Sequence, residues 1–560
     1  MAYFTTRKQF LMPSFDPEAK EREKLDKYLA MLERSGVGKV LQETKADQKF
    51  EGGRPSFNRY NMFAAVLYGF AFGASTLREL ESACRNDLRF IYLMEQERPS
   101  YSSFGYYINT FIVPNAEEIF SCVVVEILKE CGVELDDAFI DGTKIEAFVN
   151  KYKFVWKPTT WHQHLCDKVR TLLEQQNLES AVPSSGIFSS TIIAKKVSEL
   201  SGLCDACVDE HQKKILVRQN LQLQKYLSKA MEYEEKERIC GPDRNSYYKT
   251  DHDATAMCLK EDYYSGLGSN MHAAYNAQVV VIKGFACAYY VSHSRSDIND
   301  LIPTLDAFFR IHHQYPKNLC ADSGYGSMNN YQYLERHKIG NYVKYQSWDG
   351  NVSGKRPDQY HLNDDLSITC LKGNIGEQVK LNNRHPKNAG SVFYMITGCL
   401  SCPFAPYCKR FMNNKDEDYK IFEVNVGYQK YRNQATENLL SPKGIEIRVN
   451  RSIQNEGALG SLKQNMEYIR FRRRSMEKVT AEYMLTFLGY NLRKLFRYYS
   501  ENLKLSFWTA PDNLQAEVFT KPRAKRSLHT KLKQKRRVSM RWLDQLIAKR
   551  KGVENLSVIL

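Results

Sequence analysis

The arrangement that most limits the fold lies in residues 271–346, where short apolar runs alternate with amphipathic segments. Four runs predict strands: HAAYNAQVVVI, FACAYYVSH, NLCADSGYG and NYVKYQ. Helix-period segments lie between the second and third runs, from Asp297 to His313, and between the third and fourth, from Ser327 to His337. Two strands in succession, followed by alternating helix and strand, indicate an α/β sheet. The run ELDDAFIDGTKIEAFV at residues 134–149 predicts one further strand of this sheet.

The segments around this sheet predict several structural units. Residues 17–130 carry successive short helices with polar turns. They suit a helix-turn-helix-like DNA-binding domain over residues 1–130, with an ordinary helical bundle as the alternative. Residues 163–238 are highly charged with long helical periodicity, and predict a helical hairpin inserted in the fold. Residues 350–420 are polar and turn-rich with four cysteines, and residues 453–499 return to helix. We therefore expect one α/β domain built from residues 131–162, 239–349 and 421–505, with a helical insert and a cysteine-rich insert.

The charge of the chain favours a polyanionic partner. The formal net charge is +16, and residues 521–551 hold thirteen Lys and Arg against a single acid, Asp544. Nucleic acid and an anionic membrane surface both attract such a chain. The membrane alternative is disfavoured because the basic tail, residues 506–560, lacks a large apolar face beyond Trp542, Leu543, Leu546 and Ile547.

The cellular location is expected to be cytoplasmic. The N-terminal residues MAYFTTRKQF lack the apolar run of a secretory signal. The longest apolar stretch, Met62 to Ala74, is too short to span a bilayer. Fourteen cysteines in so long a chain do not indicate a secreted disulfide framework, and clustered ones are more often metal ligands.

Three acidic residues are candidates for a metal-dependent active site. Asp141 and Asp322 each end an apolar strand, where side chains of α/β sheets face a crevice. Carboxylates there can hold Mg²⁺, and a metal pair can activate the attacking oxygen and stabilise the leaving one in phosphoryl transfer. The alternative for each aspartate is a turn-forming role in Asp-Gly or Asp-Ser-Gly. The third acid, Glu456, lies on a predicted helix seven residues before Lys463, so its alternative is an exposed charge pair on one helix face.

Six ordered blocks of sequence carry a resemblance to a known family. They are FIDGTKIEAFVNKYKFVWK, TDHDATAM, YNAQVVV, ADSGYGS, QNEGALGSLKQN and EYMLTFLGYNLRKL. Together they resemble bacterial insertion-sequence transposases of the DDE type, in the branch with a large insert before the glutamate. The resemblance covers roughly residues 20 to 500, and implies that the α/β domain is an RNase H-like catalytic domain, a mixed sheet flanked by helices.

The resemblance also implies roles for individual residues. Asp141 matches the first aspartate, Asp322 the second and Glu456 the glutamate, which together would hold two Mg²⁺ or Mn²⁺ ions. Lys463 matches a lysine expected near DNA phosphate. The basic run downstream extends this DNA-binding expectation to Arg472, Arg473, Arg474 and Lys478. The chain departs from the family where many relatives have an arginine four residues before the glutamate: Ser452 stands there, and Arg451 is one position away.

The partners implied are DNA and a second copy of the chain. The family resemblance implies binding to terminal inverted repeats and to target DNA, a homodimer in a synaptic complex, and association with the nucleoid when DNA is bound. Two alternatives stay open for the activity: a metal-dependent nuclease of the same fold without strand transfer, and an inactive or domesticated transposase that only binds DNA.

Two cysteine patterns bear on metal binding. Cys399, Cys402 and Cys408 form C-x2-C-x5-C, with Cys370 upstream, and four thiolates can close a tetrahedral Zn²⁺ shell in a zinc-ribbon-like insert. Unliganded thiols are the alternative. The other CxxC, at Cys204 and Cys207, has no second pair nearby, so we expect it to bind no metal.

Other motifs are weaker guides to the chemistry. Asp251 and Asp253 in TDHDA either contact DNA, support the site or form a turn. The sequence holds neither a phosphate-binding P-loop nor a Gly-x-Ser-x-Gly elbow, so ATP use and serine hydrolysis are not indicated.

The basic tail generates a first prediction. Removal of residues 521–560 takes away most of the net charge of the chain and little apolar sequence. We expect weaker DNA binding and a shallower dependence of log affinity on log salt concentration, because each phosphate that the protein no longer neutralises reduces the slope by about 0.9. Fluorescence anisotropy with duplex DNA at several salt concentrations measures the slope. An unchanged slope would show that the tail does not touch DNA.

Overall fold

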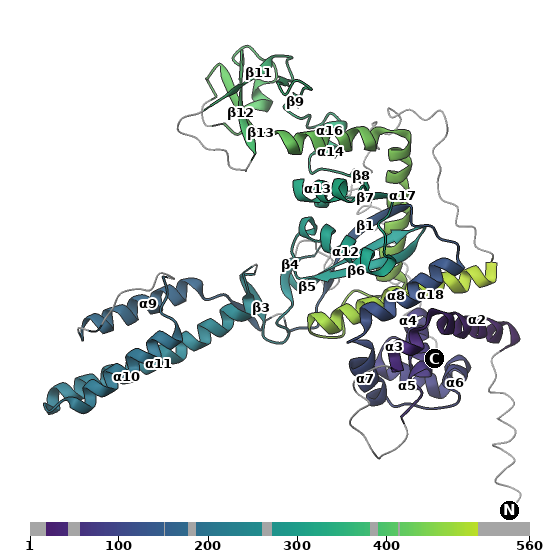
Figure 1. The fold of residues 1–560 in the computed structure, drawn as a ribbon, viewed down its shortest axis with the longest axis horizontal. Helices are drawn as coiled ribbons and strands as arrows, with labels where there is room; N and C mark the ends of the chain where they lie inside the picture. Colours follow the sequence, from purple (N-terminus) through teal and green to yellow (C-terminus); the bar gives the residue numbers. More distant parts are fainter. Residues whose placement is uncertain are drawn as a thin grey trace, which may run out of the picture. The chain divides into compact units, whose positions relative to one another are not determined.

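The structure is a computed structural model that describes residues 18–42, 56–150, 152–176, 178, 186–242, 244–259, 271–380, 390–412 and 415–501 (Figure 1). The described chain forms two compact units. The first contains residues up to Tyr345 together with the segment from Ile447 onward, and the second contains residues Gln346–Glu446. The basic tail and its expected DNA contacts lie outside the described residues.

The first unit begins with a set of short helices, as the sequence predicts. They are α2 (Ala19–Ser35), α3 (Val37–Gln42), α4 (Arg59–Phe72), α5 (Leu77–Asn86), α6 (Leu88–Leu93), α7 (Tyr101–Tyr107), the π-helical turn η4 (Ile108–Ile112) and α8 (Ala116–Glu130). Thr76 caps α5 in a reciprocal capping box with Glu79. Helix α4 is buried over nearly its whole length, because it packs against the C-terminal helix α18 (Met476–Glu501).

The same unit contains a mixed sheet. Its strands are β1 (Asp137–Glu146), β4 (Thr255–Cys258), β5 (Met271–Ile282), β6 (Phe285–Ser292), β7 (Asn318–Ala321) and β8 (Gly340–Val343). They are paired in the order β4-β5-β1-β7-β8, and β6 also pairs with β5. Strand β5 is antiparallel to β1 and to β6, whereas β7 is parallel to both β1 and β8. Helices α12 (Leu301–His312) and α13 (Met328–Arg336) connect the later strands, as their sequence periodicity predicts.

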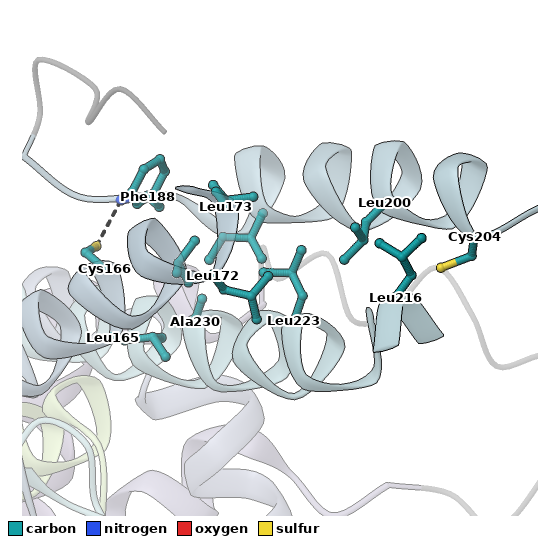
Figure 2. Close-up of a cluster of buried hydrophobic side chains, with 12 residues drawn as sticks. Leu165, Cys166, Leu172, Leu173, Phe188, Leu200, Cys204, Leu216, Leu223 and Ala230 are labelled. Carbon is teal, nitrogen blue, oxygen red and sulfur yellow. Dashed lines mark hydrogen bonds between the residues drawn. The ribbon is translucent and has the colours of Figure 1, made fainter. Parts of the chain in front are cut away.

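The helical insert differs from the expected hairpin. It contains three helices, α9 (Thr159–Glu174), α10 (Ser190–Ala206) and α11 (Glu210–Cys240). The long periodic stretch is broken where capping residues start new helices: Ser189 accepts from the amide of Ile192, and Asp209 accepts from that of His211. Leu165, Leu172, Leu173, Leu216, Leu223 and Ala230 form part of its apolar core (Figure 2). A short pair of strands, β2 (Phe154–Trp156) and β3 (Ser246–Tyr248), lies at the two ends of the insert, where it connects to the rest of the first unit.

The second unit has more regular structure than its polar sequence predicts. Five antiparallel strands are ordered β13-β12-β11-β10-β9. They are β9 (Tyr360–Leu362), β10 (Ile368–Cys370), β11 (Ile375–Val379), β12 (Ser391–Thr397) and β13 (Tyr419–Asn425), and helices α14 (Trp348–Val352), α15 (Ala405–Cys408) and α16 (Val426–Leu440) accompany them. The strands are three to seven residues long. Each is therefore too short to stand out from turn-rich sequence.

The C-terminal part of the described chain is not one continuous helix, contrary to the expectation for residues 453–499. Helix α17 (Pro442–Gly460) runs into the π-helical turn η7 (Ser461–Asn465), and an irregular segment then precedes α18. Glu467 and Ser475 have positive φ angles of 50° and 73°, which an α-helix cannot contain. Lys463 lies in η7. The seven-residue spacing from Glu456 therefore no longer equals two α-helical turns.

None of the described helices combines the length and apolar character needed to cross a membrane.

The contact between α4 and α18 generates a second prediction. A Cβ atom at Gly489 would lie 2.8–2.9 Å from backbone atoms of Phe70 and Ala71. We expect Gly489→Ala to force the two helices apart and to destabilise the protein by about 1–3 kcal/mol. The matched control is Gly202→Ala in α10, where a Cβ meets nothing within 4 Å; it should be neutral or stabilise by about 0.5–1 kcal/mol. Thermal unfolding of both variants measures the difference, and equal shifts would contradict the packing argument.

Candidate active site

Asp141 and Asp322 lie at the same level on neighbouring parallel strands. Strand β1 pairs with β7 so that Phe139 is opposite Cys320. Two residues further along each strand come Asp141 and Asp322, on the same face of the sheet as that pair. The two aspartates therefore meet at one edge, as the sequence predicts. The side chain of Asp141 is 27% exposed and that of Asp322 is 51% exposed.

The local role of each aspartate differs. Asp322 caps a short 3-10 turn, η6 (Ser323–Tyr325), and accepts a hydrogen bond from the amide of Ser323, so a turn-forming role is present at this position. Asp141 does not end its strand, which continues to Glu146. Gly142 is needed for a close approach rather than a turn, since a Cβ there would lie 2.6 Å from the side-chain amide of Gln278.

Arg451 places a positive charge against both aspartates. Its guanidinium lies 3.5 Å from Asp141 Oδ2 and 4.0 Å from Asp322 Oδ1. The helix α17 brings it there because Ile447, one turn earlier, packs in a buried cluster with Phe139 and Cys320. Sequence reasoning did not assign Arg451 a role, since it is one position away from the arginine of many relatives. The four-residue spacing from the apolar Ile447 is the sequence signal that could have placed Arg451 near the sheet.

Glu456 is exposed on the same helix, five residues after Arg451. Five residues correspond to a rotation of about 140° around an α-helix, so the two side chains leave it in different directions. Among the residues that the structure describes, no three His, Cys, Asp or Glu side chains are arranged to hold a metal ion. The expected convergence of three carboxylates is therefore present only for the two aspartates.

A polar network supports β1 from the neighbouring strand. Gln278, paired with Gly142 on β5, accepts from the hydroxyl of Tyr325 and donates to Asp297 and Asp300. The amide of Asn276 donates to the same two carboxylates, at 2.7 and 2.9 Å. Burial raises the pKa of Asp300 to about 6. The YNAQ block thus fixes the loop after Asp322 to β5, the antiparallel neighbour of the strand that carries Asp141.

The two aspartates have a donor set that fits a hard divalent cation. Carboxylate oxygens are the ligands that Mg²⁺ and Mn²⁺ prefer, and the Arg451 guanidinium already occupies the place of a cation between them. Tyr483 is fully buried, and its pKa is raised by burial and by the nearby charge of Asp141. Its hydroxyl and both amide atoms of the buried Asn455 lack a hydrogen-bond partner within the described residues.

Three acids, of which Glu482 and Asp251 are buried, hold the arginine-rich segment that precedes α18. The carboxylate of Glu482 accepts from the backbone amides of Arg472 and Arg473 at 2.9–3.2 Å. Asp251 and Asp253 accept from the amides of Ser475 and Met476, at 3.2 and 2.7 Å. The TDHDA block therefore anchors the start of α18, and it also forms a turn in which the amide of Asp253 donates to Asp251.

The side chains of the expected DNA-binding residues are only partly available. Arg472 donates to Ser75 at 2.6 Å, Arg473 to Asn109 at 3.4 Å and Arg474 to the carbonyl of Phe148 at 2.9 Å. Arg472, Arg474 and Lys478 are nevertheless exposed, whereas burial lowers the pKa of Arg473. The arginines thus join the N-terminal helices to the end of β1 and still present positive charge to solvent.

In the second unit, the four candidate zinc ligands line one small cavity of about 20 Å³. Cys370, Cys399, Cys402 and Cys408 are all partly buried. Burial raises the pKa of Cys399 and Cys408, Lys409 and Lys420 lower it, and the neighbouring thiols raise it further. The sequence spacing therefore brings the four thiols together, although they do not adopt a ligating arrangement in the described residues. By contrast, Cys204 is buried in the core of the helical insert.

Comparison with known families gives the class of the protein. Residues 14–110 match the family described as "Transposase domain (DUF772)", and residues 369–496 match the family described as "Transposase DDE domain". No curated protein and no solved structure matches the chain. Both matched families are transposase domains, so these two parts of the chain are similar to transposases. The matches support the resemblance to insertion-sequence transposases of the DDE type. The second match includes Glu456, while Asp141 and Asp322 precede it.

The cysteine cavity generates a third prediction. If the four thiols hold a structural zinc, the purified protein contains about one zinc per chain, because four thiolates complete a tetrahedral shell. Cys402→Ser should release the metal and increase hydrogen exchange in residues 360–425, while Cys204→Ser should leave the zinc content unchanged. Elemental analysis of freshly reduced protein measures the metal. Protein that contains no zinc would contradict the zinc assignment.

Proposed function

We propose that the chain is a DDE transposase that cleaves DNA strands and joins them to a target with Asp141, Asp322 and Glu456 as its catalytic acids. The observation that carries the proposal is that Asp141, within β1, and Asp322, directly after β7, lie at the same level on adjacent parallel strands, with Arg451 of α17 beside both carboxylates. The matches to transposase families supply the substrate class, which is DNA.

The order of the strands supports an RNase H-like catalytic domain. Strands β6, β5 and β1 are antiparallel neighbours, and β7 and β8 continue the sheet in parallel with β1. This is the order expected for that fold, with the first aspartate on the central strand and the second after the next parallel one. The helical insert and the cysteine-rich unit account for the long gaps between the three acids.

The residues of the site divide the work between binding and positioning. Asp141 and Asp322 would hold two Mg²⁺ or Mn²⁺ ions, which when bound activate the attacking oxygen and stabilise the leaving oxygen. Arg451 offsets the repulsion between the two carboxylates before the substrate arrives. The Tyr325–Gln278 hydrogen bond holds the loop after Asp322 against β5.

Glu456 completes the set only after a local change in α17. Its helix contains Gly457 and Gly460 and runs directly into the π-helical turn η7. A Cβ at either glycine would meet nothing within 4 Å, so the face that carries the glycines makes no packing contact, whereas Asn455, Ala458 and Leu462 on the opposite side are buried. Small changes in the backbone there alter the direction in which Glu456 points, because π turns shift the helical phase.

DNA is expected to contact both ends of the site. Lys463 in η7 and the exposed Arg472, Arg474 and Lys478 supply charge for the phosphate backbone, and the N-terminal helices supply the recognition of terminal repeats. We propose a homodimer as the synaptic form, since two element ends must be brought together.

The fourth prediction tests the catalytic acids. Asp141→Ala, Asp322→Ala and Glu456→Ala should each lower strand cleavage by about 10³-fold or more, the scale seen when an essential catalytic group is lost. DNA binding should be retained or improved, because each change removes negative charge near the phosphates. The matched control is Glu446→Ala, a partly buried acid on α17 with a lysine partner, which should cleave normally.

The assay uses a plasmid with the DNA that flanks the gene and follows both cleaved and joined products. Joined products from the unaltered chain support the transposase, whereas cleavage alone would indicate the nuclease alternative. Normal cleavage by the Glu456 variant would remove that residue from the site.

A further inference from the structure

The helical insert carries a basic groove that the catalytic proposal does not use. The groove lies between α9 and α11 and encloses about 890 Å³. Trp161, His164 and Lys168 line it from α9, and Arg218, Lys225 and Lys229 line it from α11. Four of these six side chains are cationic, against one acid in the lining, Asp167.

The charge along α11 is separated into two blocks. Residues 211–231 hold five Lys and Arg and no acid, and four glutamates then follow within residues 232–237. The insert therefore has a strongly positive stretch, although acidic residues elsewhere in the insert offset its charge. Within the described residues, Arg218 and Lys225 take part in no salt bridge, so their charge is not neutralised inside the insert.

The packing of the insert leaves these cations facing outward. Leu216 and Leu223 of α11 are buried in the apolar core of the insert (Figure 2). Arg218 and Lys225 follow each of them by two residues, a rotation of about 200° around the helix. Both are exposed, as are Lys229 on α11 and Lys168 on α9. These cations therefore face outward because the leucines of α11 face the core, and they are not needed to stabilise the helices.

The groove also presents an aromatic ring. Trp161 is 67% exposed at its edge, and an exposed tryptophan beside lysine and arginine side chains is typical of surfaces that contact nucleic acid. Arg218, Lys225 and Lys229 are separated by seven and four residues, about 10 Å and 6 Å along the helix axis. The three cations lie on one side of the helix, so they can contact separate phosphates of one strand.

We infer that the groove between α9 and α11 is a second DNA-binding surface, which holds the sugar-phosphate backbone of duplex DNA outside the catalytic sheet. The inference rests on the proposed function for its choice of DNA as the polyanion. It gives the insert a role in holding DNA, independent of the cleavage chemistry.

The fifth prediction compares two charge-matched double variants of the full chain. Arg218→Ala with Lys225→Ala removes two groove cations; Lys195→Ala with Lys213→Ala removes two exposed cations of the same insert that do not line the groove. The probe is a fluorescein-labelled duplex of random sequence. The groove variant should make the plot of log affinity against log salt shallower by about 1.8, since each phosphate contact contributes about 0.9, and the control should change it little.

A second measurement reports on the groove directly. Tryptophan fluorescence should change on DNA binding in the unaltered chain, and the change should be smaller in Trp161→Phe, because Trp542 of the basic tail still contributes, while circular dichroism shows the helices intact. Equal slopes in the two double variants, or an equal fluorescence change in Trp161→Phe and the unaltered chain, would overturn the inference. A groove variant that alters the oligomeric state in light scattering but not the slope would also overturn it, and assign the groove to self-association.

These outcomes are distinct from those of the catalytic test. If the unaltered chain does not bind the duplex at all, the proposed function and the groove inference both fail. If it binds and the groove variant matches its control, only the groove inference fails. Cleavage by the groove variant on the flanking-DNA plasmid at low salt should continue, because Arg218 and Lys225 have no place in the catalytic site.

Discussion

Two carboxylates held side by side on parallel strands are the constraint around which the first unit is built. The register of β1 and β7 places Asp141 and Asp322 at one level, where their like charges repel. The positive charge of Arg451 offsets that repulsion. Arg451 reaches the two carboxylates because Ile447, one turn earlier on α17, packs against the buried side chains of Phe139 and Cys320. The apolar contact of Ile447 thus determines which charge lies beside the two aspartates.

Other acids in this unit serve a different purpose. Glu482, Asp251 and Asp253 accept hydrogen bonds from consecutive parts of the backbone before α18, and so fix a loop whose side chains are mostly arginine. The backbone amides, rather than the guanidinium groups, satisfy these carboxylates. The arginine side chains are left to reach Ser75, Asn109 and the carbonyl of Phe148. A basic surface is therefore organised by two buried acids, Glu482 and Asp251, and the partly buried Asp253.

Much of this arrangement is predictable from the residues, for reasons that differ by element. Five strands of the mixed sheet and helices α12 and α13 follow from local periodicity, whereas the short strand β4 does not. The position of Asp322 directly after β7 follows from it too, but Asp141 lies within β1 rather than at its end. The roles of Arg451 and Glu482 do not, because each depends on contacts between segments far apart in the sequence. The break between η7 and α18 cannot be predicted from the sequence either, since the positive φ angles of Glu467 and Ser475 do not change the spacing of apolar residues. The five short strands of the second unit are obscured by polar turns of similar length.

The two ends of the helical insert meet at a short ladder of hydrogen bonds. Phe154 is paired with Tyr248 and Trp156 with Ser246, while the Lys157 amide donates to the carbonyl of Asn245 at 2.8 Å. Entry and exit of some eighty residues therefore occupy neighbouring positions, and the insert has an apolar core of its own. Segments with adjacent ends can be inserted or deleted while the rest of a fold stays in place. The length and sequence of the insert can therefore change without disturbing the sheet that carries the two aspartates.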